Sequence, residues 1–326
     1  MIFPTLGQAD SIRIFILDPG KTTDPIRGKL VVRNLSEVEC TYEALSYTWG
    51  DPNSLTSSIE FTEESLPITT NLDVALRQLR SETDTRTLWI DAVCINQQDN
   101  NEKGHQIALM HEIYRKAKSV IMWLGPPTVH TPFGLEILSF FAGDKFFNIV
   151  PWQSRSPELF REGLKDILNR DYFQRLWVVQ EIALAREVHL CVGSHQVSWK
   201  RGASAKRFMN KMKLAEISPQ WEQAGLNTIT MRPLLEVLEH MVMNTAQQIN
   251  VAVQPDLLDF IHNLRHRQTS DPRDNIYGLL ALDPEALGPD FQPDYCLSKE
   301  EIFLRFANRY LEKSYGKVYK ADVGDL

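Results

Sequence analysis

Three short apolar runs alternate with two helical patterns between residues 42 and 124, and this alternation restricts the fold more than any other feature of the chain. The runs are YEALSYTW (42–49), LWIDAVCI (88–95) and SVIMWL (119–124). Such apolar runs are typical of strands buried on both faces of a parallel sheet. Between them, apolar residues recur at helical spacing from Asn71 to Arg80 and over about 102–117. The order strand, helix, strand, helix, strand predicts an α/β sheet with right-handed crossovers.

The rest of the chain extends this sheet at its beginning and becomes helical toward its end. Ser11–Leu17 and Lys29–Arg33 are β-rich runs that predict added N-terminal strands. Beyond Pro132 we expect helices at about 133–142, 157–169 and 171–186, then a hairpin of 188–192 and 196–199 around Gly193-Ser194, and a helix opened by a capping box at Ser298 and Glu301. We therefore predict two lobes, 1–200 with a mostly parallel sheet flanked by helices and 201–326 mainly helical.

Charge and hydropathy exclude several classes of protein. Lys and Arg number 35 against 42 Asp and Glu, a net charge of −7 at pH 7, which is not typical of a nucleic-acid-binding protein. No apolar run approaches the roughly 18 residues that a membrane span needs, and the first ten residues lack the pattern of a secretory signal. Four scattered cysteines without a C-x-x-C pair favour reduced thiols and a cytoplasmic location. We expect neither a membrane nor a nucleic acid among the partners.

Several patterns that resemble known sites are incomplete. Gly20-Lys21-Thr22 matches the end of a phosphate loop, but Phe15 stands where that loop requires its first glycine. The chain contains neither G-x-G-x-x-G nor G-x-S-x-G, so it lacks the dinucleotide fingerprint and the nucleophile elbow. His189, Cys191 and His195 would share one strand face if the alternation ran unbroken, but the turn at Gly193-Ser194 interrupts it and no fourth zinc ligand is evident. We expect no metal site.

Two polar loops follow predicted strands and are harder to dismiss. One is Ser46-Tyr47-Thr48-Trp49-Gly50-Asp51, and the other runs from Asp91 to Asn96 and Gln97. In open α/β sheets, ligands bind beyond the carboxyl ends of the strands, so these loops are candidate walls of a pocket. The alternative is that Trp49 belongs to the core and Asp91 caps a turn. Both interpretations stay open at this point.

A third feature is the segment Trp177-Val-Val-Gln-Glu181 within a predicted helix. Residues at i and i+4 lie on one helical face, so the indole and the carboxylate are stacked. An aromatic neighbour makes the surroundings of a carboxylate less polar, which raises its pKa. Such a group acts as a nucleophile or cation stabiliser in glycosyl transfer. The alternative is a structural ion pair of Glu181 with Arg175, Arg186 or Lys165.

Four ordered motifs closely resemble the fungal heterokaryon incompatibility (HET) domain. They are YEALSYTWGD (42–51), LWIDAVCINQ (88–97), EKGHQIALMHEIYRKAKSVIMWLG (102–125) and RLWVVQEIALA (175–185). DPRDNIYGLL (271–280) and PDY (293–295) look like the segment that commonly follows this domain. The resemblance covers nearly the whole chain. It implies a role in non-self recognition between fungal strains, which ends in growth arrest or cell death. It also implies an upstream incompatibility or sensor protein, whose identity the sequence does not reveal.

HET domains are thought to be distantly similar to Toll/interleukin-receptor (TIR) domains, which implies a TIR-like, flavodoxin-like sheet. NAD-cleaving TIR domains carry W-x-x-x-E on a helix, and Trp177 and Glu181 fit that spacing. The resemblance makes Glu181 the candidate catalytic carboxylate, with Trp177 stacking on the substrate and Arg175 meeting a phosphate. The residues that would border the nucleotide pocket are Ser46, Tyr47, Trp49, Gly50, Asp51, Asp91, Asn96 and Gln97. Some fifty residues between Leu124 and Trp177, and the helical lobe after 200, have no TIR counterpart.

By this resemblance the chain cleaves the bond between nicotinamide and ribose, with NAD as substrate and no separate cofactor. Nicotinamide leaves as a neutral base, so the main demand is stabilisation of the oxocarbenium-like ribosyl centre, which a carboxylate meets. TIR active sites are often completed by a neighbouring subunit, which implies a homo-oligomer on activation. Two alternatives remain open, a non-catalytic death-signalling scaffold that oligomerises and a nucleotide sensor without turnover.

Overall fold

A computed structural model describes residues 2–51, 53–55, 57–246, 256–283, 285–288 and 290–322. In these ranges nine strands form one mixed sheet in the order β5-β4-β2-β1-β6-β3-β7-β8-β9. The strands are β1 (Ser11–Leu17), β2 (Ile26–Asn34), β3 (Glu43–Tyr47), β4 (Ser57–Glu60), β5 (Ser65–Ile68), β6 (Arg86–Trp89), β7 (Ser119–Trp123), β8 (Glu187–Val192) and β9 (His195–Lys200). The helices are α1 (Thr70–Leu79), α2 (Asp91–Cys94), α3 (Asn100–Lys116), α4 (Thr131–Ala142), α5 (Pro157–Leu168), α6 (Trp177–Ala183), α7 (Ala203–Glu216), α8 (Pro219–Gln223), α9 (Arg232–Ala246), α10 (Leu257–Leu264), α11 (Asp274–Tyr277) and α12 (Lys299–Asp322).

The centre of the sheet is parallel, and the α/β class is confirmed. Strand β3 pairs in parallel with β6 on one side and β7 on the other, so that Ala44 lies beside both Trp89 and Val120, and β8 continues the parallel set. The prediction of a mostly parallel sheet holds for this centre, but the sheet as described is mixed, with a further parallel pair, β2–β4, and four antiparallel pairs. The antiparallel pairs are β1–β2, β1–β6, β4–β5 and β8–β9. The hairpin around Gly193-Ser194 is confirmed.

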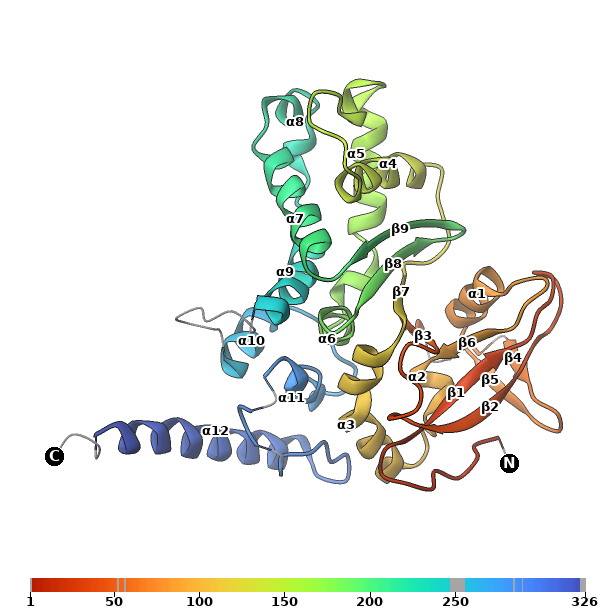
Figure 1. Ribbon diagram of the computed structural model, residues 1–326, viewed down its shortest axis with the longest axis vertical. Coiled ribbons are helices and arrows are strands. Elements are labelled where there is room, and N and C mark those ends of the chain that lie inside the picture. The colour runs from red at the N-terminus through yellow and green to blue at the C-terminus, as the bar shows by residue number, and fades with distance from the viewer. Residues whose placement is uncertain are drawn as a thin grey trace.

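Helices cover both faces of the parallel centre (Figure 1). The connection from β3 to β6 runs through α1, and the connection from β6 to β7 returns past β3 through α2 and α3. Right-handed crossovers that run in opposite directions along a sheet place their helices on opposite faces. Helix α1 buries the predicted stripe of Leu72, Ala75, Leu76 and Leu79.

Two predicted elements are shorter than expected. Strand β6 ends at Trp89, and 91–94 form helix α2, where the Cys94 N–H donates to the Ile90 carbonyl at 2.7 Å. The single helix expected over 171–186 is split into a 3₁₀ turn, η2 (Asp171–Gln174), and α6. It is split because the backbone at Arg175 is extended, and Leu176 N–H donates to the Gln268 carbonyl at 3.0 Å.

The long insertion between β7 and β8 holds α4 and α5, which pack against each other through two glycines. A Cβ atom built on Gly134 would lie 2.3 Å from the carbonyl oxygen of Gly163, a separation that no side chain tolerates. Glycine at both positions therefore lets the two helix backbones touch. These helices stand at one end of the molecule together with α7 and α8 (Figure 1).

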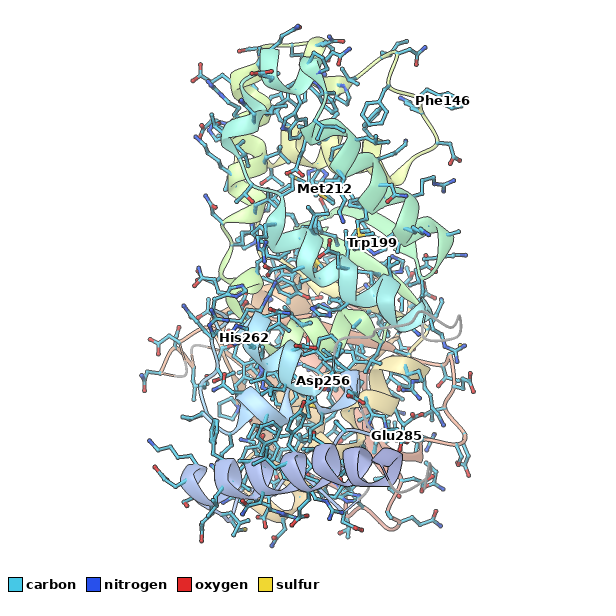
Figure 2. All side chains as sticks on the ribbon, turned by 90° about the vertical axis from the view of Figure 1, so that its left-hand side faces the viewer. Phe146, Trp199, Met212, Asp256, His262 and Glu285 are labelled. Carbon is cyan, nitrogen blue, oxygen red and sulfur yellow. The ribbon has the colours of Figure 1, made fainter. Side chains whose placement is uncertain are left out.

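The main hydrophobic core continues across residue 200. Trp199 of β9 packs on Phe208 of α7 with ring centroids 5.0 Å apart, and α9 contributes Leu234, Val237 and Leu238 to the same core. A second apolar cluster joins α6 to α10, α11 and α12, and α12 lies across the opposite end of the molecule (Figure 2). The division into lobes at residue 200 stays a prediction. Among the helices described, none is both long enough and apolar enough to span a membrane.

Candidate functional site

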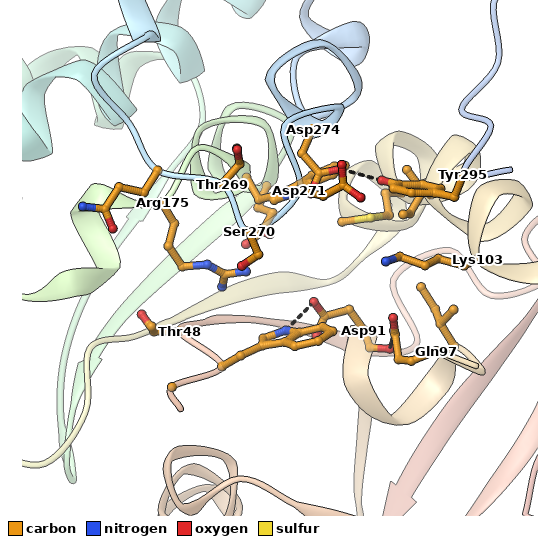
Figure 3. A pocket seen from close by; sticks show the side chains of 18 residues that line it. Thr48, Asp91, Gln97, Lys103, Arg175, Thr269, Ser270, Asp271, Asp274 and Tyr295 are labelled. Carbon is orange, nitrogen blue, oxygen red and sulfur yellow. Dashed lines mark hydrogen bonds between the residues drawn. The ribbon is translucent and has the colours of Figure 1, made fainter. Parts of the chain in front are cut away.

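A cavity of about 450 Å³ opens where β3 and β6 end, against helices α3 and α6 (Figure 3). Its wall contains acids, cations and aromatic rings from six separate stretches of the chain. The lining residues are Thr48, Trp49, Gly50, Asp91, Ile95, Gln97, Lys103, Ile107, Met110, Arg175, Trp177, Glu181, Gln268, Thr269, Ser270, Asp271, Asp274 and Tyr295. The position agrees with the general rule that ligands bind at the carboxyl ends of parallel strands.

Glu181 lies in this wall with only 2% of its surface exposed. The Ser46 hydroxyl donates a hydrogen bond to its Oε2, and the same hydroxyl lies 2.6 Å from the phenolic oxygen of Tyr172. Burial raises the pKa of Glu181 to about 7, while the positive charge of Arg175 and the hydrogen bond from Ser46 act in the opposite direction. Its carboxyl group therefore changes charge near neutral pH.

Glu181 is held in place by a helix that is buried on almost every side. In α6 the residues on both sides of the carboxylate, Val179, Gln180 and Ile182, are all buried. None of the three ion pairs considered from the sequence forms: Lys165 pairs with Glu162, Arg186 pairs with Glu39, and Arg175 donates to the carbonyl of Tyr47. Within the described ranges Glu181 takes part in no ion pair.

Two tryptophan rings in the wall are each held by a carboxylate. The indole Nε1 of Trp49 donates to Asp91 at 2.9 Å, and that of Trp177 donates to Asp274 at 3.0 Å. The phenol of Tyr295 donates to the second oxygen of Asp274 at 2.6 Å. Burial raises the pKa of both Asp91 and Asp274. Asp91 also accepts from the N–H of Ala92 at 2.7 Å, so it caps a turn and fixes an indole at once.

The cations Arg175 and Lys103 enter the cavity from opposite sides (Figure 3). Arg175 stands in the extended stretch before α6 and is anchored by its bond to the Tyr47 carbonyl. Lys103 comes from α3, and its Nζ lies 4.6 Å from the centre of the Tyr295 ring, a cation–π contact. Both side chains are partly exposed.

Most of the site residues predicted from the sequence meet at this cavity. Seven line it, namely Trp49, Gly50, Asp91, Gln97, Arg175, Trp177 and Glu181. Ser46 and Tyr47 lie behind the wall, the first bonded to Glu181 and the second offering its carbonyl to Arg175.

Two predicted pocket residues, Asp51 and Asn96, do not line the cavity. Each side chain accepts a backbone N–H two residues further on, from Asn53 at 2.9 Å and from Gln98 at 3.2 Å respectively. Short polar side chains at turns commonly make this local bond. In the structure these two side chains stabilise turns beside the cavity, and their contact with a nucleotide stays a prediction.

The sequence did not reveal several residues of the wall. Lys103, Ile107 and Met110 repeat at helical spacing on α3 and read as an ordinary helix face. Asp271, Asp274 and Tyr295 fall in the two motifs noted after residue 270, which is the one indication that those positions matter. Within the described ranges, no group of three or more His, Cys, Asp or Glu side chains is placed to hold a metal ion.

Comparison with known proteins points to one family. Residues 42–181 match the family model described as heterokaryon incompatibility protein (HET). The chain is also 27% identical, over an alignment of 342 positions, to Heterokaryon incompatibility protein 6, OR allele, of Neurospora crassa. That alignment covers 84% of this chain and 48% of the relative, so the chain spans about half the length of the curated relative it matches. No solved structure matches the chain.

Proposed function

Since residues 42–181 are a heterokaryon incompatibility (HET) domain, we propose that this chain is an effector of fungal non-self recognition. It triggers growth arrest or cell death by cleaving NAD to nicotinamide and ADP-ribose, as a TIR-like glycohydrolase. The relative from Neurospora crassa carries heterokaryon incompatibility in its name, which supports the first half of the proposal. The second half rests on the chemistry of the cavity.

The observation that carries the proposal is the buried carboxylate of Glu181 in the cavity wall. Cleavage of the nicotinamide–ribose bond releases a neutral base, so the reaction needs stabilisation of a cationic ribosyl centre more than it needs an acid. A carboxylate with few surrounding waters stabilises such a cation strongly, because the local dielectric constant is low. With a pKa of about 7, Glu181 is ionised in a large fraction of molecules at neutral pH.

The rest of the cavity suits the same substrate. Trp49 and Trp177 offer indole rings, on which a cationic nicotinamide ring stacks favourably. The volume of about 450 Å³ is within the usual range of small-molecule sites. The parallel strands β6-β3-β7-β8 stand in the order second, first, third, fourth along the chain, which is the order of flavodoxin-like sheets. That order supports a TIR-like arrangement.

The direct test is release of nicotinamide from NAD by the purified chain, with and without a crowding agent that promotes assembly. We expect Glu181→Gln to lower the rate by about 100-fold or more, as loss of a charge-stabilising group commonly does. Glu158→Gln is the matched control, because Glu158 is an exposed glutamate of α5 outside the cavity. Equal release by wild type and Glu181→Gln would refute the role of Glu181.

A non-catalytic scaffold that oligomerises on activation is the second candidate. Phe146, labelled in Figure 2, is 82% exposed in the connection after α4, and Ile149 in the same connection is 75% exposed. Contiguous exposed apolar patches are typical of association surfaces, and under this second candidate function Phe146 and Ile149 would belong to one. The scaffold predicts no nicotinamide release under any assembly condition, growth arrest that survives Glu181→Gln, and loss of that arrest in Phe146→Ser.

A further inference from the structure

The cavity holds two cations that have no carboxylate partner. Among the described residues, no Asp or Glu oxygen lies within ion-pair distance of Lys103 or Arg175. Some arginines of the chain are paired with acids, for example the buried Arg13 with Glu102 at 2.6 Å and the partly buried Arg170 with Asp166 at 3.2 Å, whereas Arg80 and Arg201 donate to backbone carbonyls. Arg175 donates to the Tyr47 carbonyl and Lys103 lies over the Tyr295 ring, but neither contact neutralises the positive charge, which leaves both cations available to an anionic ligand.

The carboxylates of the same wall are already occupied by donors of the protein. Asp274 accepts from Trp177 and Tyr295, Asp91 accepts from Trp49, and the carboxylate of Asp271 pairs with Arg273 at 2.6 Å. These bonds leave Lys103 and Arg175 without a direct ion pair, although the positive charge of Arg175 acts on Asp91 and Glu181 and that of Lys103 acts on Asp91, Asp271 and Asp274.

The charged ends of Lys103 and Arg175 point toward each other across the cavity, with Ser270 beside Arg175 (Figure 3). We propose that this gap is an anion subsite that holds the diphosphate of a dinucleotide, with Lys103 as a substrate-binding residue. The inference rests on the proposed function, since it places the phosphates of the same substrate whose glycosidic bond meets Glu181. Charge-assisted bonds to phosphate oxygens are the strong contacts in such sites.

The position of Lys103 is set by a segment far beyond the HET match. A Cβ built on Gly104 would lie 2.9 Å from the Pro293 carbonyl oxygen, so 293–295 press directly on α3 next to Lys103. The Tyr295 ring then supports the ammonium group at 4.6 Å. The subsite is therefore assembled from α3, the stretch before α6 and the chain near Tyr295.

The test is titration calorimetry of the full chain with inorganic pyrophosphate and with ADP-ribose. We expect Lys103→Gln to raise the dissociation constants of both ligands by about tenfold or more, the usual loss of affinity for one charge-assisted bond. Lys103→Arg keeps the charge and is expected to bind both ligands nearly as tightly as wild type. Lys206→Gln removes the same charge from the exposed side of α7 and is the matched control. Binding is expected to weaken as salt is raised.

The proposal is overturned if Lys103→Gln binds pyrophosphate as wild type does, or if Lys206→Gln loses as much affinity. Kinetics distinguish this failure from failure of the proposed function. If NAD is cleaved, Lys103→Gln is expected to raise KM for NAD about tenfold while leaving cleavage of nicotinamide riboside, which has no phosphate, unchanged. Pyrophosphate binding that depends on Lys103 without any nicotinamide release would retain the subsite and refute the glycohydrolase.

Discussion

At Glu181, burial and hydrogen bonding act on one carboxyl group in opposite directions, and the balance sets a pH dependence. Burial raises its pKa from 4.5 to about 7, so below pH 7 most folded molecules carry the neutral acid, which does not stabilise a ribosyl cation. We expect kcat/KM for nicotinamide release to rise with pH and to reach half its maximum near pH 7, since kcat/KM reports the free enzyme. The measurement is a rate profile from pH 5 to pH 9, and a rate that falls through this range would contradict the assignment.

Ser46 offers an independent test of the same balance. Its hydroxyl donates to the carboxylate and so favours the charged form. Ser46→Ala removes that bond, and we expect the midpoint of the pH profile to move to higher pH. Thr41→Ala, which removes a hydroxyl bonded at 2.7 Å to the Val38 carbonyl far from the cavity, is expected to leave the midpoint unchanged. An unchanged midpoint in Ser46→Ala would show that the hydrogen bond does not act on Glu181.

The raised pKa of Glu181 also makes a prediction for stability. The pKa of Glu181 is about 7 in the folded chain, against the ordinary value of 4.5 that applies to the unfolded chain. Between pH 4.5 and pH 7 the folded chain therefore keeps a proton that the unfolded chain loses. The contribution of this group to the free energy of unfolding is full below pH 4.5 and falls as pH rises through 7. The loss is at most about 3 kcal/mol.

Glu181→Gln removes the free-energy cost of burying a charged carboxylate, because an amide stays neutral at every pH. We expect the variant to be more stable than wild type at pH 8, by up to about 3 kcal/mol, with a smaller difference at pH 5. Urea unfolding at the two pH values measures the difference. The exposed control Glu158→Gln should stay within about 0.5 kcal/mol of wild type at both. If Glu181→Gln were less stable than wild type at pH 8, the stabilisation of the carboxylate by Arg175 and Ser46 would exceed the destabilisation that burial causes.

The residues of the site differ in how far the sequence reveals them. Trp177 and Glu181 are found because both lie on one helix at a spacing of four, and Asp91 is found because it follows an apolar strand. Asp274 and Lys103 were not found, since their roles depend on contacts with residues 97 and 192 positions away, namely Trp177 and Tyr295. Local spacing carries no information about such contacts.

The spacing of apolar residues predicts the helices and strands that bury only one face. It fails for elements that are buried on every face. The stripe of α1 and the alternation of the β8–β9 hairpin place these elements correctly. Apolar residues continue through α2 on both sides of Asp91, so the sequence led us to expect a strand that extends past its true end at Trp89. Strands β4 and β5 were not expected, because each has four residues and one contains Pro67.

The crossing of α4 and α5 depends on glycine at a single point of contact. Ala at position 134 would place a methyl group 2.3 Å from the Gly163 carbonyl, so the helices must separate. We expect Gly134→Ala to lower the free energy of unfolding by about 1–3 kcal/mol, measured by urea unfolding. Gly7→Ala, where an added Cβ meets no atom within 4 Å, is the control and should change stability little. Equal stability of the two variants would refute the close contact.

Across the whole molecule, the cavity joins parts of the chain that are far apart. The HET match ends at Glu181, yet Gln268, Asp274 and Tyr295 complete the wall. Gln268 reaches the site because its N–H donates to the Gln174 carbonyl at 2.6 Å, beside the extended residue Arg175. The sequence predicted that helices follow residue 200 but not that they turn back onto the site, since this return depends on pairing between distant segments.

The last prediction concerns the boundary at residue 200, and we expect a chain cut there not to fold independently. Phe141 of α4 packs on Phe208 and Trp221, and Trp199 packs on Phe208, so the cut would expose aromatic faces that belong to one core. Each large apolar side chain brought into water costs about 1.5–3 kcal/mol, which soon exceeds the stability of a domain. The cut also removes Arg267, which donates to the Phe173 carbonyl at 2.8 Å and steadies the stretch before α6.

The measurement compares residues 1–200 with the full chain by urea unfolding, followed through tryptophan fluorescence, and by pyrophosphate titration. The full chain is expected to unfold in one transition and to bind pyrophosphate. The fragment is expected to show no cooperative transition and no binding, because it lacks Tyr295 beside Lys103 and Gln268 beside Arg175. A fragment that unfolds cooperatively would establish two independent lobes, and one that also binds pyrophosphate would show that residues 1–200 alone complete the anion subsite.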